Sequence, residues 1–122
     1  MKYIIFPIYF LIHLIIFSGN IFYLAGEHNQ AIDIYSNLNN YPQEDAAIGF
    51  NNMGNSYYKL NDFENAIQSY QQAINRTKDN NVKFNADYNL GNSYFRQGQM
   101  ILFKSTRSEE RRVGKECRSR WS

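Results

Sequence analysis

The chain is poor in the residues that build disulfide-bonded and metal-binding proteins. Among its 122 residues are one cysteine, Cys117, and two histidines, His13 and His28, which are isolated from other candidate ligands. A single thiol forms no disulfide within the chain, and isolated histidines lack the spacing of a metal-ligand set. The sequence therefore predicts a fold that depends on neither disulfides nor metal ions.

Catalytic and cofactor-binding motifs are also missing. The carboxylates are scattered without a metal-ligand grouping, and no glycine-rich phosphate loop follows a strand-like segment. No segment alternates polar and apolar residues as a half-buried strand does. We therefore expect an all-α protein that is not an enzyme and that has no catalytic residues, cofactor, metal or small-molecule substrate.

What the chain does contain is an internal repeat. The pattern Gly-Asn-x-aromatic-aromatic occurs at residues 19–23, 54–58 and 91–95. The three glycines are 35 and 37 residues apart. Such a period is typical of a unit of two helices that buries its apolar face only by stacking on further copies.

A second pattern supports helix pairs. Twelve residues after each of the first two glycines the chain reads Ala-Ile-x-x-Tyr, at residues 31–35 and 66–70, but no such motif follows Gly91. We expect Gly54 and Ala66 to lie where two antiparallel helices cross, because small side chains let the backbones come close.

The helix boundaries are also marked in the sequence. Apolar residues recur every three or four positions over residues 45–59, which predicts an amphipathic helix. Between the expected helices stand Gly26, Asn61 and Gly98, residue types that tolerate the left-handed backbone that closes a helix. Asp62 is expected to cap the helix that follows Asn61.

Together these residues resemble the tetratricopeptide repeat, a helix-pair unit of about 34 residues. The middle unit carries the pattern of this family at Phe50, Met53, Gly54, Tyr57, Ala66, Tyr70 and Ala73. The first unit matches at Gly19, Phe22, Ala31 and Tyr35, and the third at Leu90, Gly91 and Tyr94 before it departs. The resemblance implies a solenoid of antiparallel helix pairs that binds proteins or peptides.

The resemblance also implies a binding groove. In this family the first helices of the units line a concave groove, and the residue after the glycine commonly points into it. The candidate peptide-binding residues are therefore Asn51, Asn55, Tyr58, Lys59, Tyr88, Asn92, Phe95 and Arg96. Amides hydrogen-bond to a peptide backbone, aromatic rings add apolar area, and the basic groups meet a carboxylate. The alternative is that these asparagines only solvate a helix in an asparagine-rich chain.

The N-terminal segment is apolar. After Lys2, residues 3–26 hold no charged residue when His13 is neutral, and residues 4–17 are dense in Ile, Leu and Phe. This run, followed by the small residues Ser18 and Gly19, fits a secretory signal peptide, but it is also long enough to span a bilayer. We expect export or anchoring with the repeats outside the cytoplasm. The alternative is a buried first helix of the repeat.

The C-terminal segment differs from the rest of the chain. Residues 107–122 read RSEERRVGKECRSRWS and hold the only cysteine, the only tryptophan and six of the thirteen basic residues. The string resembles a translated sequencing adapter, which predicts an artefact; a solvated basic tail and a nucleic-acid contact are the weaker interpretations. Without it the chain has seven basic and eight acidic residues, so its charge predicts no nucleic-acid partner.

The sequence thus divides into a signal peptide or membrane anchor (1–18), a partial first unit (19–44), a second unit (45–81), a truncated third unit (82–106) and the artefact tail (107–122). We expect a protein-interaction scaffold with a protein or peptide partner, exported across or anchored in a bacterial inner membrane through the N-terminal segment. Two alternatives are a subunit of a membrane complex similar to those of bacterial aerotolerance operons, and a structural protein that self-assembles through its uncapped apolar face.

Overall fold

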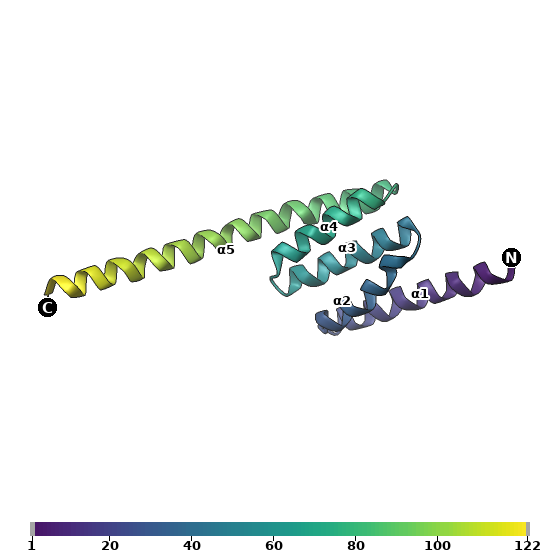
Figure 1. The fold of residues 1–122 in the computed structure, drawn as a ribbon, viewed down its shortest axis with the longest axis horizontal. Helices are drawn as coiled ribbons and strands as arrows, with labels where there is room; N and C mark the ends of the chain where they lie inside the picture. The colour runs from purple at the N-terminus through teal and green to yellow at the C-terminus, as the bar shows by residue number, and fades with distance from the viewer. Residues whose placement is uncertain (1, 122) are drawn as a thin grey trace.

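The protein is a stack of antiparallel helices. A computed structural model describes residues 2–121, and every regular element in this range is helical. The elements are α1 (Lys2–Leu24), α2 (His28–Ser36), the 3-10 helix η1 (Asn37–Asn40), α3 (Gln43–Lys59), α4 (Phe63–Arg76) and α5 (Asn80–Trp121). Helices α1 and α2 form one pair, α3 and α4 form a second, and α5 packs against α4 (Figure 1). The prediction of an all-α solenoid of helix pairs is confirmed.

The turns within the two pairs have the same backbone geometry. Gly26 after α1 has a φ of 81°, and Asn61 after α3 has a φ of 59°. In both turns the next residue donates its N–H to the carbonyl five positions earlier, at 2.9 Å. This Schellman pattern requires a left-handed residue, which explains the choice of glycine and asparagine. Asp62 then accepts a hydrogen bond from the Asn65 N–H at 3.2 Å, so the predicted cap is also confirmed.

The predicted third turn at Gly98 is wrong, because α5 continues through this residue to Trp121. Three places after Gly98 are equivalent to the cap and core positions of the second pair, but they carry residues that do not suit a helix pair. Gln99 stands in place of Asp62, Phe103 in place of Ala66 and Arg107 in place of Tyr70. The alanine and tyrosine positions are 0% and 1% exposed in the second pair. A core this tight has no room for a phenylalanine in place of alanine, and a buried arginine would lose its hydration. A straight exposed helix therefore replaces the turn.

Two small cores hold the stack together. The first joins α1, α2 and α3 and contains the buried residues Ala31, Ile32, Tyr35 and Met53. The second joins α3, α4 and α5 and contains Ala66, Tyr70, Ala73 and Ala86. Each core has a tyrosine that is 1% exposed. Burial of these large rings contributes apolar stabilisation to each pair.

Each core tyrosine lies against a glycine of the preceding helix. A Cβ atom built on Gly54 would be 2.6 Å from Cε1 of Tyr70, and one built on Gly19 would clash in the same way with Cε1 of Tyr35. The sequence pattern placed Gly54 opposite Ala66, whereas the atoms nearest to it belong to the Tyr70 ring. The glycines therefore make room for an aromatic ring rather than for a second backbone.

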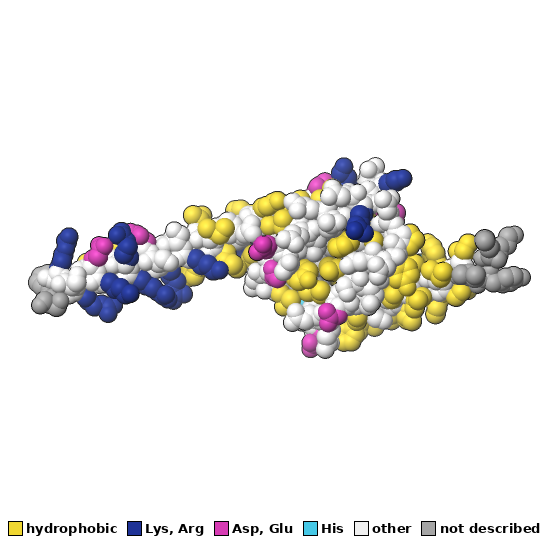
Figure 2. Space-filling model, in the orientation of Figure 1, with side chains coloured by type: hydrophobic (Ala, Val, Ile, Leu, Met, Phe, Trp, Pro, Cys, Tyr) yellow, Lys and Arg dark blue, Asp and Glu magenta, His cyan; other side chains and the backbone are white. Residues whose placement is uncertain are grey.

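The first part of α1 projects from the stack and presents an apolar surface (Figures 1 and 2). Ile5–Leu24 is the one stretch of the described residues that is long and apolar enough to cross a bilayer. Its exposed side chains include Phe6, Phe10 and Phe17. The same helix also packs into the first pair, since Ile12 is buried and the Tyr35 ring lies against Gly19. A candidate membrane segment and the first helix of the repeat are thus one continuous helix.

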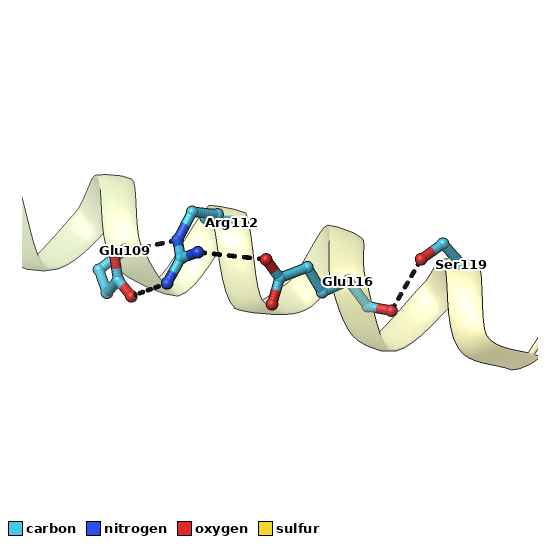
Figure 3. Close-up of polar contacts among 4 residues, drawn as sticks. All are labelled: Glu109, Arg112, Glu116 and Ser119. Atoms are coloured by element: carbon cyan, nitrogen blue, oxygen red, sulfur yellow. Dashed lines mark hydrogen bonds and ion pairs between the residues drawn. The ribbon is translucent and has the colours of Figure 1, made fainter.

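The last part of α5 projects from the other side of the molecule, where Lys and Arg side chains line it (Figures 1 and 2). Residues 101–120 are exposed apart from the half-buried Gly114. Arg112 pairs with Glu109 at 2.6 Å and with Glu116 at 3.2 Å, and Ser119 donates to the Glu116 carbonyl at 2.9 Å (Figure 3). Ion pairs this exposed contribute little to stability.

Candidate functional site

A pocket of about 210 Å³ lies where α1, α3 and α5 come together. These three are the first helices of the successive units, and α3 contacts both of the others. The pocket is lined by residues of all three helices and by one residue of α4: Tyr23, Asn55, Tyr58, Lys59, Tyr70, Asn89 and Asn92. We call this surface the interhelical groove. Only the folded stack brings its residues together.

Four of the eight sequence-predicted binding residues line the interhelical groove. Asn55, Tyr58 and Lys59 come from the last turns of α3, and Asn92 comes from α5. Lys59 is exposed, while the other three are half-buried. The side chains therefore present amide, phenol and ammonium groups, which hydrogen-bond to a peptide backbone or to a carboxylate.

The other four predicted residues lie outside this pocket. Tyr88 and Phe95 are both 66% exposed on α5. The guanidinium of Arg96 lies over the Phe63 ring at 5.6 Å, and the Tyr58 ring meets the same Phe63 edge-on at 5.4 Å. Arg96 and the groove residue Tyr58 thus contact the same ring, that of Phe63. Asn51 is half-buried, and its Oδ1 has no hydrogen-bond partner within residues 2–121.

The oxygen of Asn55 is already used inside the protein. The Tyr70 hydroxyl donates to Asn55 Oδ1 at 2.7 Å, and Asn89 Nδ2 donates to the same oxygen at 3.2 Å. The first pair repeats the tyrosine contact, because Tyr35 donates to Asn20 Oδ1 at 2.5 Å. The Asn55 side chain therefore has no free acceptor for the peptide backbone that is expected to bind there. Its Nδ2 group is what remains for a ligand.

Burial keeps both core tyrosines protonated. It raises the pKa of Tyr35 to about 12, with a smaller contribution from nearby Tyr23. It raises the pKa of Tyr70 further above its ordinary value, with smaller contributions from Tyr23 and Tyr58. Both phenols therefore keep their protons at neutral pH and act as hydrogen-bond donors to the asparagine oxygens.

Sequence reasoning missed three residues of the interhelical groove. Tyr23 occupies the same place after its glycine as Tyr58, so the repeat pattern itself could have identified it. Asn89 lies 34 residues after Asn55, which is about one repeat period. Tyr70 was assigned to packing only, and no sequence signal shows that its hydroxyl reaches the groove.

The comparisons with known proteins identify one repeat. The family model described as tetratricopeptide repeat matches residues 47–77. This range covers most of α3 and all of α4, which include Gly54, Asn55 and Tyr70. No curated protein and no solved structure matches the chain significantly. The α3–α4 pair is thus a tetratricopeptide repeat.

Proposed function

We propose that the interhelical groove binds an extended peptide segment of a partner protein. A tetratricopeptide repeat supports a role in protein–protein interaction. The observation that carries the proposal is that three separate helices contribute Tyr23, Asn55 and Asn92 to one pocket. A groove that crosses several repeats suits an extended chain, which contacts each helix in turn.

The polar groups of the groove favour a peptide that carries a carboxylate. The Nδ2 group of Asn55 and the amide of Asn92 are placed to hydrogen-bond with backbone groups of the peptide. Lys59 and Arg96 supply positive charge at the end of the groove, where Tyr58 adds a rigid ring. An acidic side chain or a free C-terminal carboxylate is the complementary group for this end.

We also propose that α1 exports the repeats or tethers them to a membrane, with the repeats outside the cytoplasm of a bacterial cell. The exposed apolar surface of its first part supports this proposal. Residues 5–18 span only about 21 Å as a helix, less than the bilayer core of about 30 Å. A retained anchor therefore holds the first pair at the membrane surface. Cleavage after Ser18 instead keeps both Gly19 and Asn20, which contact Tyr35.

The groove proposal is tested by selecting peptides on the full chain in detergent micelles. Peptides enriched from a displayed random library are labelled, and their affinities are measured by fluorescence anisotropy. The test variant is Lys59→Ala with Asn92→Ala, which we expect to weaken binding about ten- to hundredfold. Asn55 is left unchanged because its removal leaves the buried Tyr70 hydroxyl without an acceptor.

The matched control is Asn75→Ala with Asn80→Ala, two exposed residues outside the groove. We expect it to bind every selected peptide with unchanged affinity. If the groove variant also keeps its affinity for all of them, the proposal is wrong. Circular dichroism of each variant shows that lost binding does not come from lost folding.

A further inference from the structure

The apolar stretch of α1 has the length of a complete membrane span. Ile5–Leu24 contains 20 residues. As a helix they extend about 30 Å, which matches the apolar core of a bilayer. In the sequence the charged Lys2 lies before this stretch and the charged Glu27 lies after it. A spanning helix therefore has to use nearly all of these residues.

The same stretch also builds the first helix pair. The residues of α1 that pack against the rest of the stack are Ile12, Gly19, Asn20, Phe22 and Tyr23. The contacts with Gly19 and Asn20 are made by the ring and the hydroxyl of Tyr35. Only the part before Ile12, residues 5–11, projects freely, and it is about 10 Å long. This part alone is too short to cross a bilayer.

Helix α1 cannot meet both requirements at the same time. A membrane that takes in Ile5–Leu24 surrounds the helix with lipid, including the side that faces α2. Helix α2 cannot follow it into the bilayer, because α2 carries the charged Asp33 and the amides of Asn29 and Gln30. Insertion therefore separates α1 from α2 and uncovers the ring of Tyr35.

We propose that α1 has two mutually exclusive positions, packed against α2 or spanning a membrane, and that the spanning position opens the interhelical groove. This inference rests on the proposed tethering by α1 and adds a consequence for peptide binding. In the spanning position the groove loses Tyr23, the residue that α1 contributes to it. By linkage, a peptide that contacts Tyr23 favours the packed position and opposes insertion.

The test compares two chains in the same vesicles of phosphatidylcholine and phosphatidylglycerol. One is the unchanged chain, and the other carries a block of about thirteen leucine and alanine residues inserted after Phe6, which lengthens the projecting part to about 20 residues. The lengthened chain can span the bilayer without using Ile12 or Tyr23. Hydrogen exchange of α2, measured by mass spectrometry, reports whether the first pair is intact.

We expect the amides of α2 to exchange more than about tenfold faster in the unchanged chain than in the lengthened chain. Helix α2 has only nine residues, and a helix this short is not stable in water without a packed partner. The second core holds no residue of α1 among its described members. Exchange of α4 should therefore be the same in both chains, which makes α4 the internal control.

Phe10→Arg provides the packed reference. The arginine opposes membrane insertion, and Phe10 is 67% exposed, so the variant keeps its fold. Its α2 should exchange as slowly as that of the lengthened chain. In vesicles, a peptide selected for the interhelical groove should bind the lengthened chain about tenfold more tightly than the unchanged chain. Equal affinities, with unequal exchange of α2, would overturn the coupling between α1 and the groove.

Flotation of the vesicles separates a failure of this inference from a failure of the tethering proposal. An unchanged chain that does not float with the vesicles would contradict tethering by α1 and the two positions with it. A chain that floats but exchanges as slowly as Phe10→Arg would leave tethering intact and overturn the two positions. Fast exchange of α2 in the lengthened chain as well would show that lipid contact opens the first pair whatever the length of α1, which also overturns the inference.

Discussion

The ring of Tyr70 lies on the α-carbon of Gly54, where a Cβ atom would be 2.6 Å from its Cε1. The same side chain donates its hydroxyl to Asn55, the next residue, at 2.7 Å. Glycine and asparagine thus form one receptor for one tyrosine, because the first provides space and the second accepts the hydrogen bond. The receptor recurs at residues 19–20 with Tyr35, so it is the packing unit of this chain.

The space above Gly54 predicts that even one added methyl group destabilises the protein. Gly54→Ala should lower the free energy of unfolding by about 1 to 3 kcal/mol, because the rigid and buried Tyr70 ring has to shift. The higher helix propensity of alanine recovers only part of this loss. Thermal unfolding followed by circular dichroism measures the change.

Gly91→Ala is the matched control for that substitution. The added methyl group would meet no atom within 4 Å, so only helix propensity changes, and the variant should gain about 1 kcal/mol of stability. A Gly54→Ala variant that melts at or above the temperature of the unchanged chain would contradict the role assigned to the Tyr70 ring.

The buried tyrosines predict a loss of stability at alkaline pH. Their folded pKa values lie above the ordinary value of about 10, so the stability they contribute is complete below pH 10. It is lost as the pH rises through about 12, the folded pKa of Tyr35. Urea unfolding at pH 8, 10 and 11 should show this decline. Tyr35→Phe with Tyr70→Phe should show a smaller decline over the same range, and an equal one would contradict the assignment.

The sequence predicted the fold better than it predicted the contacts. Periodicity, Gly26 and Asn61 identified the helix pairs, because helix faces and left-handed turns depend on local residues. The continuation of α5 through Gly98 depends instead on whether Phe103 and Arg107 fit a core formed by other helices. The internal use of Asn55 depends on Tyr70, which lies 15 residues further along the chain. Contacts of this kind follow from packing and not from residue type.

The exposed apolar surface of α1 predicts that the segment directs export. A reporter that is active only outside the cytoplasm, fused after Thr106, should be active in bacterial cells. Phe10→Arg should abolish this activity, because a central arginine costs about 2.5 to 3.5 kcal/mol in membrane insertion. Phe10 is 67% exposed, whereas the nearby Ile12 is buried and would report on folding as well. An inactive reporter on the unchanged chain would show that α1 acts only as a repeat helix, and activity retained by Phe10→Arg would show that export does not depend on the apolar surface of α1.

Deletion of residues 107–122 should leave the melting temperature unchanged. The described side chains of this segment lie outside both cores, and its ion pairs are exposed. Only the helical signal should fall, in proportion to the residues removed. A clear drop in melting temperature would contradict the interpretation of this segment as an artefact of sequencing.

The straight course of α5 predicts that a few substitutions will fold it back into a third pair. The changes are Gln99→Asp, Phe103→Ala, Arg107→Tyr and Glu110→Ala, which restore the cap and the core residues of the second pair at equivalent places. The tyrosine then covers Gly91 and donates to Asn92. Small-angle X-ray scattering should show a shorter molecule. The melting temperature should rise by roughly 4 to 8 °C if the new core adds about 1 kcal/mol.

The control for this redesign keeps Arg107 and makes only the other three changes. Without a tyrosine the glycine stays uncovered, and an arginine at that place would have to leave water without a partner. The control should therefore keep the long dimension of the unchanged chain and its melting temperature. If the fourfold variant also stays extended, then the glycine–asparagine receptor is insufficient to hold a helix, and the contacts of Tyr35 and Tyr70 follow from the other packing in their pairs.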